Sequence, residues 1–190
     1  MYQKYYTEAL VLESSERGEA DRVFALYTKD FGLVRARASA VRSENSRMRY
    51  ALQSYSHVQV ALVRGKRGWR AGGATLIARI GGDIEGVSTF ARIARLVTRL
   101  VAGEEQNTYL FAALVEAHIA LIKNTREAYP MIEVVCVART LFALGYLSSE
   151  ALQTTLFAHA SYTEKDLAEA LTLKERLLTS INRAISETHL

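Results

Sequence analysis

The sequence predicts an α+β fold, with an N-terminal five-stranded β-barrel of the OB type followed by an all-α domain. Up to residue 80, short runs of alternating apolar residues are separated by turns that contain Gly and Ser. After residue 81, apolar residues recur at intervals of three and four, as on one face of a helix. The 190 residues suffice for two small domains, which we place at 1–80 and 81–190.

Five strands are expected in the first domain. Short runs bounded by turn signals, with no helical pattern between most of them, are typical of an antiparallel sheet or a closed barrel. The stretch 42–54 is expected to be a loop with a short helical turn, an insertion that fits a small Greek-key barrel. The expected strands are residues 6–12, 22–28, 32–41, 55–64 and 68–80.

The second domain is expected to be helical. Residues 131–144 are almost continuously apolar and predict a central buried helix, which Pro130 fits at its first turn and Gly145 at its end. Thr163 is expected to cap the last helical stretch. The expected helices are residues 87–102, 107–123, 131–144, a short one within 148–157, and 163–187.

The formal net charge of +4 is unevenly distributed along the chain. Residues 1–80 carry 14 Lys and Arg against 7 Asp and Glu, whereas residues 81–190 carry 10 against 13. Within 29–80 the basic residues outnumber the acidic ones by 11 to 2. This separation predicts a polyanion-binding first half, and the alternative is a solvated basic face with no partner.

The sequence indicates a cytoplasmic protein with no membrane association. No stretch approaches the roughly 18 uninterrupted apolar residues of a membrane span, and the polar, aromatic start does not resemble a signal peptide. Cys136 is the single cysteine, which excludes an intrachain disulfide and a multi-cysteine zinc site.

The expected strand 32–41 carries the best candidate binding face. Side chains alternate along a strand, so Arg35 and Arg37 share one face while the small apolar residues Val34, Ala36 and Ala38 share the other. The two arginines would lie roughly 7 Å apart, close to the spacing of successive phosphates along one strand. Pairing of either arginine with an acidic residue of a neighbouring strand is the alternative.

Further candidates lie in the loops and in the hairpin before the fifth strand. Loops and one sheet face of an OB barrel are where single strands bind, and aromatic side chains there stack on bases. Trp69 also fits a core position, and Tyr55 fits either role. The basic candidates are Arg42, Arg47, Arg49, Arg64, Lys66, Arg67 and Arg70, and the stacking candidates are Tyr55 and Trp69.

Catalysis has little support, and we expect neither an enzyme nor a cofactor nor a metal. The four histidines are scattered, and none has metal-ligand spacing with another His or Cys. Cys136 lies in the most apolar helix, as a buried thiol would. Gly72 and Gly73 fall in a strand pattern, which favours a bulge over a ligand site.

Several of these segments resemble the N-terminal domain of the bacterial RecO family of recombination mediators. The resemblance spans about residues 8–80 in order and with compatible spacing. It rests on residues 18–22 (GEADR), 27–28 (YT), 31–35 (FGLVR), 46–47 (SR), 52–53 (LQ) and the basic hairpin up to residue 74. The helical part agrees with the family in architecture only, for example at 141–146 (LFALGY).

The resemblance implies an OB-fold and a helical domain in a non-enzymatic, nucleoid-associated mediator of recombinational DNA repair. It implies binding of single- and double-stranded DNA, annealing of complementary strands, and assistance in loading the RecA recombinase. A RecR-like protein and the C-terminal tail of the single-stranded-DNA-binding protein are the implied partners. Arg92, Arg95 and Arg99, the basic cluster of the second half, are candidates for that acidic tail.

Two features depart from the family pattern. Many relatives carry a four-cysteine zinc module after the central helix, which one cysteine cannot build. Relatives usually continue to a basic end, whereas the segment after Gly145 is short and ends in SETHL. The barrel is therefore expected to carry most of the DNA contact. The rival function is an interaction adaptor, whose barrel binds an acidic protein segment through the same basic face.

Overall fold

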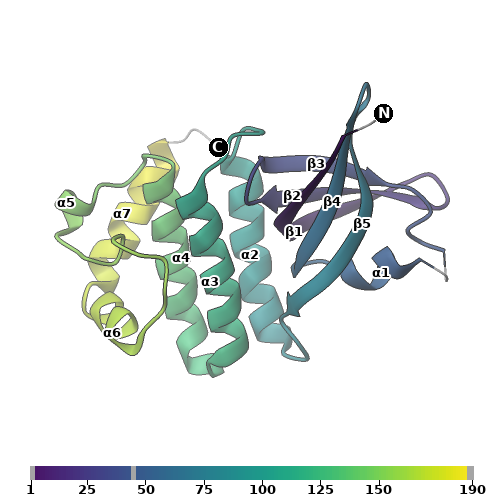
Figure 1. The fold of residues 1–190 in the computed structure, drawn as a ribbon. Helices are drawn as coiled ribbons and strands as arrows, with labels where there is room; N and C mark the ends of the chain where they lie inside the picture. The colour runs from purple at the N-terminus through teal and green to yellow at the C-terminus, as the bar shows by residue number, and fades with distance from the viewer. Residues whose placement is uncertain (1–2, 44–45, 188–190) are drawn as a thin grey trace. The chain divides into compact units, whose positions relative to one another are not determined.

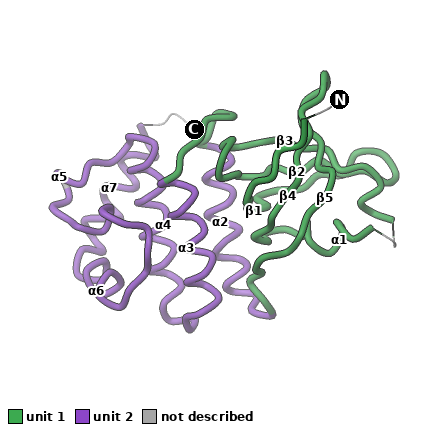
Figure 2. Tube along the Cα trace, in the orientation of Figure 1, with its two compact units in different colours: residues 1–81, 100–108 green, residues 82–99, 109–190 purple. Residues whose placement is uncertain are grey.

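The computed structural model describes residues 3–43 and 46–187 (Figure 1). The remaining residues include Glu44 and Asn45 of the expected loop 42–54 and His189 near the C-terminus, and they lie outside this description. The chain divides into two compact units, residues 1–81 with 100–108 and residues 82–99 with 109–190 (Figure 2).

The first unit contains a closed five-stranded barrel, which confirms the predicted OB-type fold (Figure 1). Its strands follow the order β1-β2-β3-β5-β4, and every pairing is antiparallel except that of β3 with β5. A short helix, α1 (Arg47–Ala51), lies in the connection from β3 to β4. The strands are β1 (Lys4–Arg17), β2 (Asp21–Thr28), β3 (Gly32–Ala38), β4 (Ser56–Gly65) and β5 (Gly68–Arg79).

The first and third strands differ in length from the prediction. β1 continues beyond residue 12 because its partnership with β2 persists as far as Arg17, which pairs with Asp21 after a register shift between Val11 and Glu13. β3 ends at Ala38, three residues early. Just beyond it, Ala40 has a left-handed φ of 52°, and its N–H donates to Asp21 Oδ1 at 2.9 Å.

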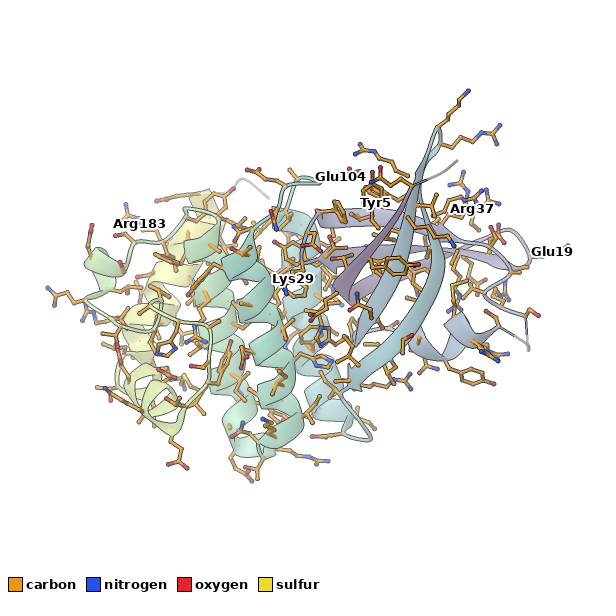
Figure 3. All side chains as sticks on the ribbon, viewed as in Figure 1. Tyr5, Glu19, Lys29, Arg37, Glu104 and Arg183 are labelled. Carbon is orange, nitrogen blue, oxygen red and sulfur yellow. The ribbon has the colours of Figure 1, made fainter. Side chains whose placement is uncertain are left out.

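The barrel core consists of alternate residues from all five strands. Val34, Ala36 and Ala38 point inward, which confirms the predicted alternation in β3. Trp69 is 4% exposed, and its ring lies 5.6 Å from Tyr5 (labelled in Figure 3) and 5.2 Å from Phe31. Aromatic pairs at such distances stabilise a core beyond the area that they bury.

The segment 100–108 belongs to the barrel unit because its backbone continues the hydrogen bonding of β3. Leu33 N–H donates to the carbonyl of Gly103 at 3.1 Å. At the neighbouring Gly32, whose φ is 64°, a Cβ would collide with the backbone of Glu105. Gly32 therefore permits both the turn after β2 and the close approach of this segment.

The second unit is all helical, as predicted. α4 has Pro130 in its first turn, and Gly145 follows it with a φ of 81°, so both predicted end signals are confirmed. The expected last helix is divided at Leu173, and the expected helix within 148–157 is only one turn long. The helices are α2 (Ile84–Leu100), α3 (Thr108–Lys123), α4 (Tyr129–Ala143), α5 (Ser149–Leu152), α6 (Glu164–Thr172) and α7 (Lys174–Glu187), with a 3-10 turn at Arg126–Ala128.

The chain between α5 and α6 has little regular structure and is held by one buried side chain. Arg139 of α4 is fully buried and donates to the carbonyls of Leu156 at 2.9 Å, Ala160 at 2.6 Å and Ser161 at 2.9 Å. Its guanidinium also lies 4.6 Å from the ring centre of Tyr162. These hydrogen bonds from the planar guanidinium thus hold a segment that lacks the regular backbone hydrogen bonds of a helix or a sheet.

None of the helices within the described part of the chain combines the length and the apolar character that crossing a membrane requires.

Candidate nucleic-acid interface

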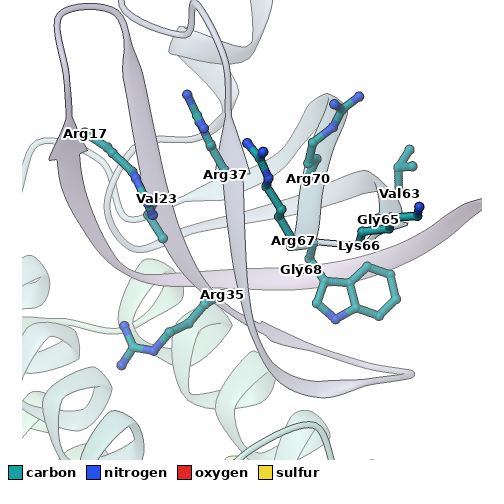
Figure 4. A pocket seen from close by; sticks show the side chains of 11 residues that line it. Arg17, Val23, Arg35, Arg37, Val63, Gly65, Lys66, Arg67, Gly68 and Arg70 are labelled. Carbon is teal, nitrogen blue, oxygen red and sulfur yellow. The ribbon is translucent and has the colours of Figure 1, made fainter.

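A groove of about 600 Å³ runs along the outside of the barrel, between β3 and the hairpin that joins β4 to β5 (Figure 4). We call it the basic groove. Six of its eleven lining residues are basic and none is acidic. Its basic residues are Arg17, Arg35, Arg37, Lys66, Arg67 and Arg70. These positions lie on or beside the β2–β3 face and the β4–β5 loop, which bind oligonucleotides in OB-folds.

Strand alternation presents the arginines of β3 outward. Arg35 and Arg37 are exposed while the residues on either side of them are buried. In Figure 4, Arg37, Arg67 and Arg70 extend toward the same side of the view, and Arg35 extends away from them. The groove thus brings together two β3 arginines and a hairpin that are more than 25 residues apart in the sequence.

The parallel seam between β3 and β5 sets the spacing of two cations. Ala36 pairs with Trp69, and Arg37 pairs with Arg70. Neighbouring strands lie about 4.8 Å apart, so the two arginine side chains leave the sheet side by side. Like charges in this arrangement repel each other and favour a bound anion.

An aspartate at the start of β2 partly neutralises this pair. Arg37 Nε donates to Asp21 Oδ2 at 2.8 Å, which confirms the alternative that an acidic residue of a neighbouring strand holds this arginine. The Ala40 N–H and the Arg37 guanidinium together hold the pKa of Asp21 below its usual value. Asp21 therefore stays ionised and orients Arg37 at the edge of the groove.

The β4–β5 hairpin supplies the remaining cations. Lys66 and Arg67 occupy its turn, which Gly68 closes with a φ of 95°. Neither residue forms an ion pair with any other described residue, and the same holds for Arg17, Arg35 and Arg70. Arg64 differs, because it pairs with Glu104 at 3.4 Å, lies over the Trp69 ring and does not line the groove.

The assignment of Trp69 as a base-stacking residue is wrong. Its side chain points into the barrel, where it packs with Tyr5 and Phe31, because β5 alternates and the flanking Gly68 and Arg70 face outward. Trp69 forms part of the groove floor without offering a free ring face. Trp69 thus takes the core position that the sequence left open as the alternative.

The other candidates from the sequence lie away from the basic groove. Arg42 and Arg49 line a smaller pocket with Arg22. Glu16, which does not line this pocket, pairs with Arg22 at 3.3 Å and with Arg42 at 3.4 Å. Arg47 lines a third groove, described below. Tyr55 is half-buried, with a φ of 63°, at the end of β4 opposite the hairpin.

Arg17 is a groove residue that the sequence did not predict. It falls beyond the expected end of the first strand, and only the extension of β1 to Arg17 brings it beside the start of β2. Residues 13–17 (ESSER) are all polar, so the sequence carries no apolar alternation that would extend the strand to Arg17.

In the helical unit, the predicted basic cluster is exposed on α2. Arg92 is held by Glu133, with Nε–Oε1 and Nη2–Oε2 distances of 2.7 and 2.6 Å. Arg95 and Arg99 form no ion pair with the described residues. Two of the three arginines therefore remain for an external anion.

The described residues contain no cluster of three or more His, Cys, Asp and Glu side chains arranged to hold a metal ion. Burial raises the pKa of the Cys136 thiol to about 12, so this cysteine stays protonated near neutral pH.

Comparisons with known proteins match the barrel. Residues 1–70 fit the family model described as "Recombination protein O N terminal". The DNA repair protein RecO of Heliobacterium modesticaldum is 37% identical over 99 residues, which cover 50% of this chain and 36% of that protein. The DNA repair protein RecO of Desulfitobacterium hafniense (strain DSM 10664 / DCB-2) is 37% identical over 62 residues, or 33% and 23% of the two chains.

The matched residues thus span about a third or less of the length of these relatives. The residues matched by the family model include β1 to β4 and the start of β5, from which the basic groove is built. The barrel of this chain is therefore similar to the N-terminal domain of RecO proteins.

Proposed function

We propose that the barrel binds single-stranded DNA in the basic groove and that the protein acts as a non-enzymatic mediator of recombinational DNA repair. The observation that supports this most is the groove itself, with six basic and no acidic lining residues on the ligand-binding side of an OB barrel. The names of the relatives, DNA repair protein RecO, support the same process.

The proposed binding is electrostatic and tolerant of sequence. The guanidinium and ammonium groups of the groove neutralise phosphates and release counterions, so affinity falls steeply with salt. Among the groove's described side chains, only the arginines could read base edges through a pair of parallel hydrogen bonds. The phosphates bind these arginines first, so we expect the groove to distinguish little between bases. Double-stranded DNA, which carries the same phosphates, is expected to bind to the same groove.

Annealing of complementary strands follows from this chemistry. Two strands repel each other through their phosphates, and a surface with an excess of positive charge screens that repulsion. Assistance in loading the RecA recombinase and cooperation with a RecR-like protein form the wider role that we propose, with the protein acting at the nucleoid.

For the acidic C-terminal tail of the single-stranded-DNA-binding protein, we propose α2 as the contact. Arg95 and Arg99 lie one helical turn apart and are exposed, so both can face one acidic segment. Arg92 contributes less because Glu133 already holds it.

The test is binding and annealing of fluorescent oligonucleotides at about 50 mM salt, where phosphate contacts are strong. The double variant Arg35→Glu/Arg37→Glu is expected to lose most of the binding and annealing. Normal binding by this variant would contradict the assignment of the groove. Failure of the wild-type protein to bind any oligonucleotide would favour the rival function, an adaptor for an acidic protein segment.

A further inference from the structure

A second groove, of about 430 Å³, lies on the outer surface of β1, β4 and β5 beside α1. We call it the Tyr6 groove. Tyr6 lines it and has 68% of its surface exposed. Arg47 is the one charged residue among the lining residues, all of which belong to the described part of the chain.

Small residues beside Tyr6 leave its ring uncovered. Tyr6 pairs with Ala61 across β1 and β4, and Ala61 pairs with Gly73 across β4 and β5. The three residues therefore form one row across the sheet. The Tyr6 ring stands at one end of the row, and Ala61 and Gly73 add only a methyl group and a hydrogen beside it. A flat group of the size of a nucleobase can lie in this row against the ring.

The fold does not require glycine at the floor of the groove. Neither Gly72 nor Gly73 is among the glycines with a positive φ. A Cβ at Gly72 would lie 3.8 Å from the nearest atom, and one at Gly73 4.0 Å, which is ordinary contact. The predicted bulge is present, since the register shifts between Ala61 and Leu62, but a bulge of this kind does not demand two glycines. Glycine inside a strand weakens it and often marks a bulge, a bend or a place where a ligand or another backbone comes close.

The Tyr6 groove continues the path of the basic groove along β5. Gly68, Trp69 and Arg70 line the basic groove, and Gly72 to Thr75 line the Tyr6 groove. At about 3.3 Å per residue, the two sets follow each other within the length of a few nucleotides. Arg47 forms no ion pair with the described residues and supplies a positive charge at the side of the Tyr6 groove.

We infer that the Tyr6 groove is a nucleotide subsite, in which a base of the bound single strand stacks on Tyr6 over Gly72 and Gly73 while Arg47 contacts a phosphate. The inference rests on the proposed function, because the same strand must first occupy the basic groove. It adds what that groove lacks, an exposed aromatic ring, after Trp69 proved to be a core residue.

The experiment measures binding of fluorescein-labelled oligothymidylates of about 4 and about 16 nucleotides, the range of site sizes of an OB-fold. Loss of one stacking contact weakens binding by about 5-fold or more. Tyr6→Ala is expected to show this loss with the longer oligonucleotide and little change with the shorter one. Tyr6→Phe, which keeps a ring, is expected to bind as the wild type does.

Two further variants separate stacking from charge and from folding. Gly73→Val fills the floor with a residue that suits a strand, and it is expected to weaken binding while leaving thermal stability unchanged or higher. Arg47→Gln is expected to lower the salt slope by about 1, whereas Tyr6→Ala leaves the slope unchanged. The matched controls are Tyr50→Ala, at a tyrosine 62% exposed outside the groove, and Gly81→Val, at an open glycine.

Ultraviolet cross-linking to 5-iodouracil oligonucleotides, followed by mass spectrometry, is expected to label the peptide that contains Tyr6. Binding by Tyr6→Ala and Gly73→Val equal to that of the wild type, with no label on Tyr6, would overturn this inference alone and leave the basic groove as the binding site. Absence of binding by the wild-type protein to either oligonucleotide would overturn the inference together with the proposed function.

Discussion

Arg37 on β3 and Arg70 on β5 are register partners across the one parallel pairing of the barrel. Asp21 holds Arg37, while no carboxylate of the described chain lies within 4.0 Å of the Arg70 guanidinium. The barrel therefore brings two cations together and neutralises only one of them.

Asp21→Asn is expected to increase the affinity for single-stranded DNA. The change removes a negative charge that competes with phosphate for Arg37, while the amide oxygen can still accept the Ala40 N–H. Oligonucleotide titrations of the two proteins at equal salt measure this. Weaker binding by the variant would mean that the orientation of Arg37 by Asp21 matters more than the competition.

Asp21→Asn is also expected to make the free energy of unfolding fall less as the pH is lowered into the acid range. The pKa of Asp21 is lower in the folded protein than the unfolded value of about 3.9. Its contribution to stability is thus complete above that unfolded value and is lost as the pH falls through the lower folded pKa. Urea unfolding between about pH 6 and pH 3 compares the two proteins, and parallel profiles would contradict the assignment.

Trp69→Ala is expected to lower the free energy of unfolding by about 3–5 kcal/mol, the usual cost of removing a large core aromatic side chain. Trp69→Phe is expected to cost less and, since the ring is no base platform, to bind oligonucleotides within about 2-fold of the wild type, a change well below the loss of a stacking contact. Urea denaturation and binding titrations at low temperature test both statements. A large loss of affinity in a stably folded Trp69→Phe protein would contradict the core assignment.

His57 is expected to make the barrel less stable as the pH falls below neutrality. Burial lowers the pKa of His57 from 6.5, and it outweighs the Glu8 carboxylate 3.1 Å away, which raises it. Because the pKa of His57 is lower in the folded protein, the contribution of its neutral form to stability is present above the ordinary pKa of 6.5. This contribution is lost as the pH falls through the folded pKa. His57→Gln should therefore make the free energy of unfolding depend less on pH between about pH 7 and 5. Glu8→Gln should make it depend more on pH, because it removes the carboxylate that raises the pKa of His57.

Arg139→Lys is expected to destabilise the helical unit by at least about 2 kcal/mol, since an ammonium cannot reproduce the planar fork that reaches three carbonyls. Amide hydrogen exchange should accelerate at residues 153–163 first. Arg183→Lys, on the exposed face of α7, is the matched control and should change stability by less than about 0.5 kcal/mol. Unchanged exchange in this segment would contradict the role given to Arg139.

The sequence predicted those parts of the site that depend on local pattern. Alternation along residues 32–38 placed Arg35 and Arg37 outward, and Pro130 and Gly145 marked the ends of α4. Alternation could not decide the direction of Trp69, because it lies one residue from a hairpin turn and is flanked by polar and glycine residues on both sides.

Long-range relationships were not predictable from one sequence. The partnership of Arg37 with Arg70 depends on the closure of the barrel, and the inclusion of Arg17 depends on how far β1 and β2 remain paired. The sequence alone allows the ion pair between Arg37 and Asp21 only as one alternative, because the residue opposite a strand position is set by register. The Tyr6 groove likewise needs three strands in register before Tyr6, Ala61 and Gly73 form one row.

Whether DNA binds in the basic groove can be tested by comparing the salt dependence of oligonucleotide binding for the wild type, Arg70→Gln and Arg64→Gln. Arg70 follows Trp69 in β5 and Arg64 lies opposite Trp69 on β4, but only Arg70 lines the basic groove. If DNA binds in this groove, Arg70→Gln weakens binding and lowers the slope of log affinity against log salt by about 1, while Arg64→Gln changes neither. Equal slopes for Arg70→Gln and the wild type, or a loss confined to Arg64→Gln, would contradict binding in this groove.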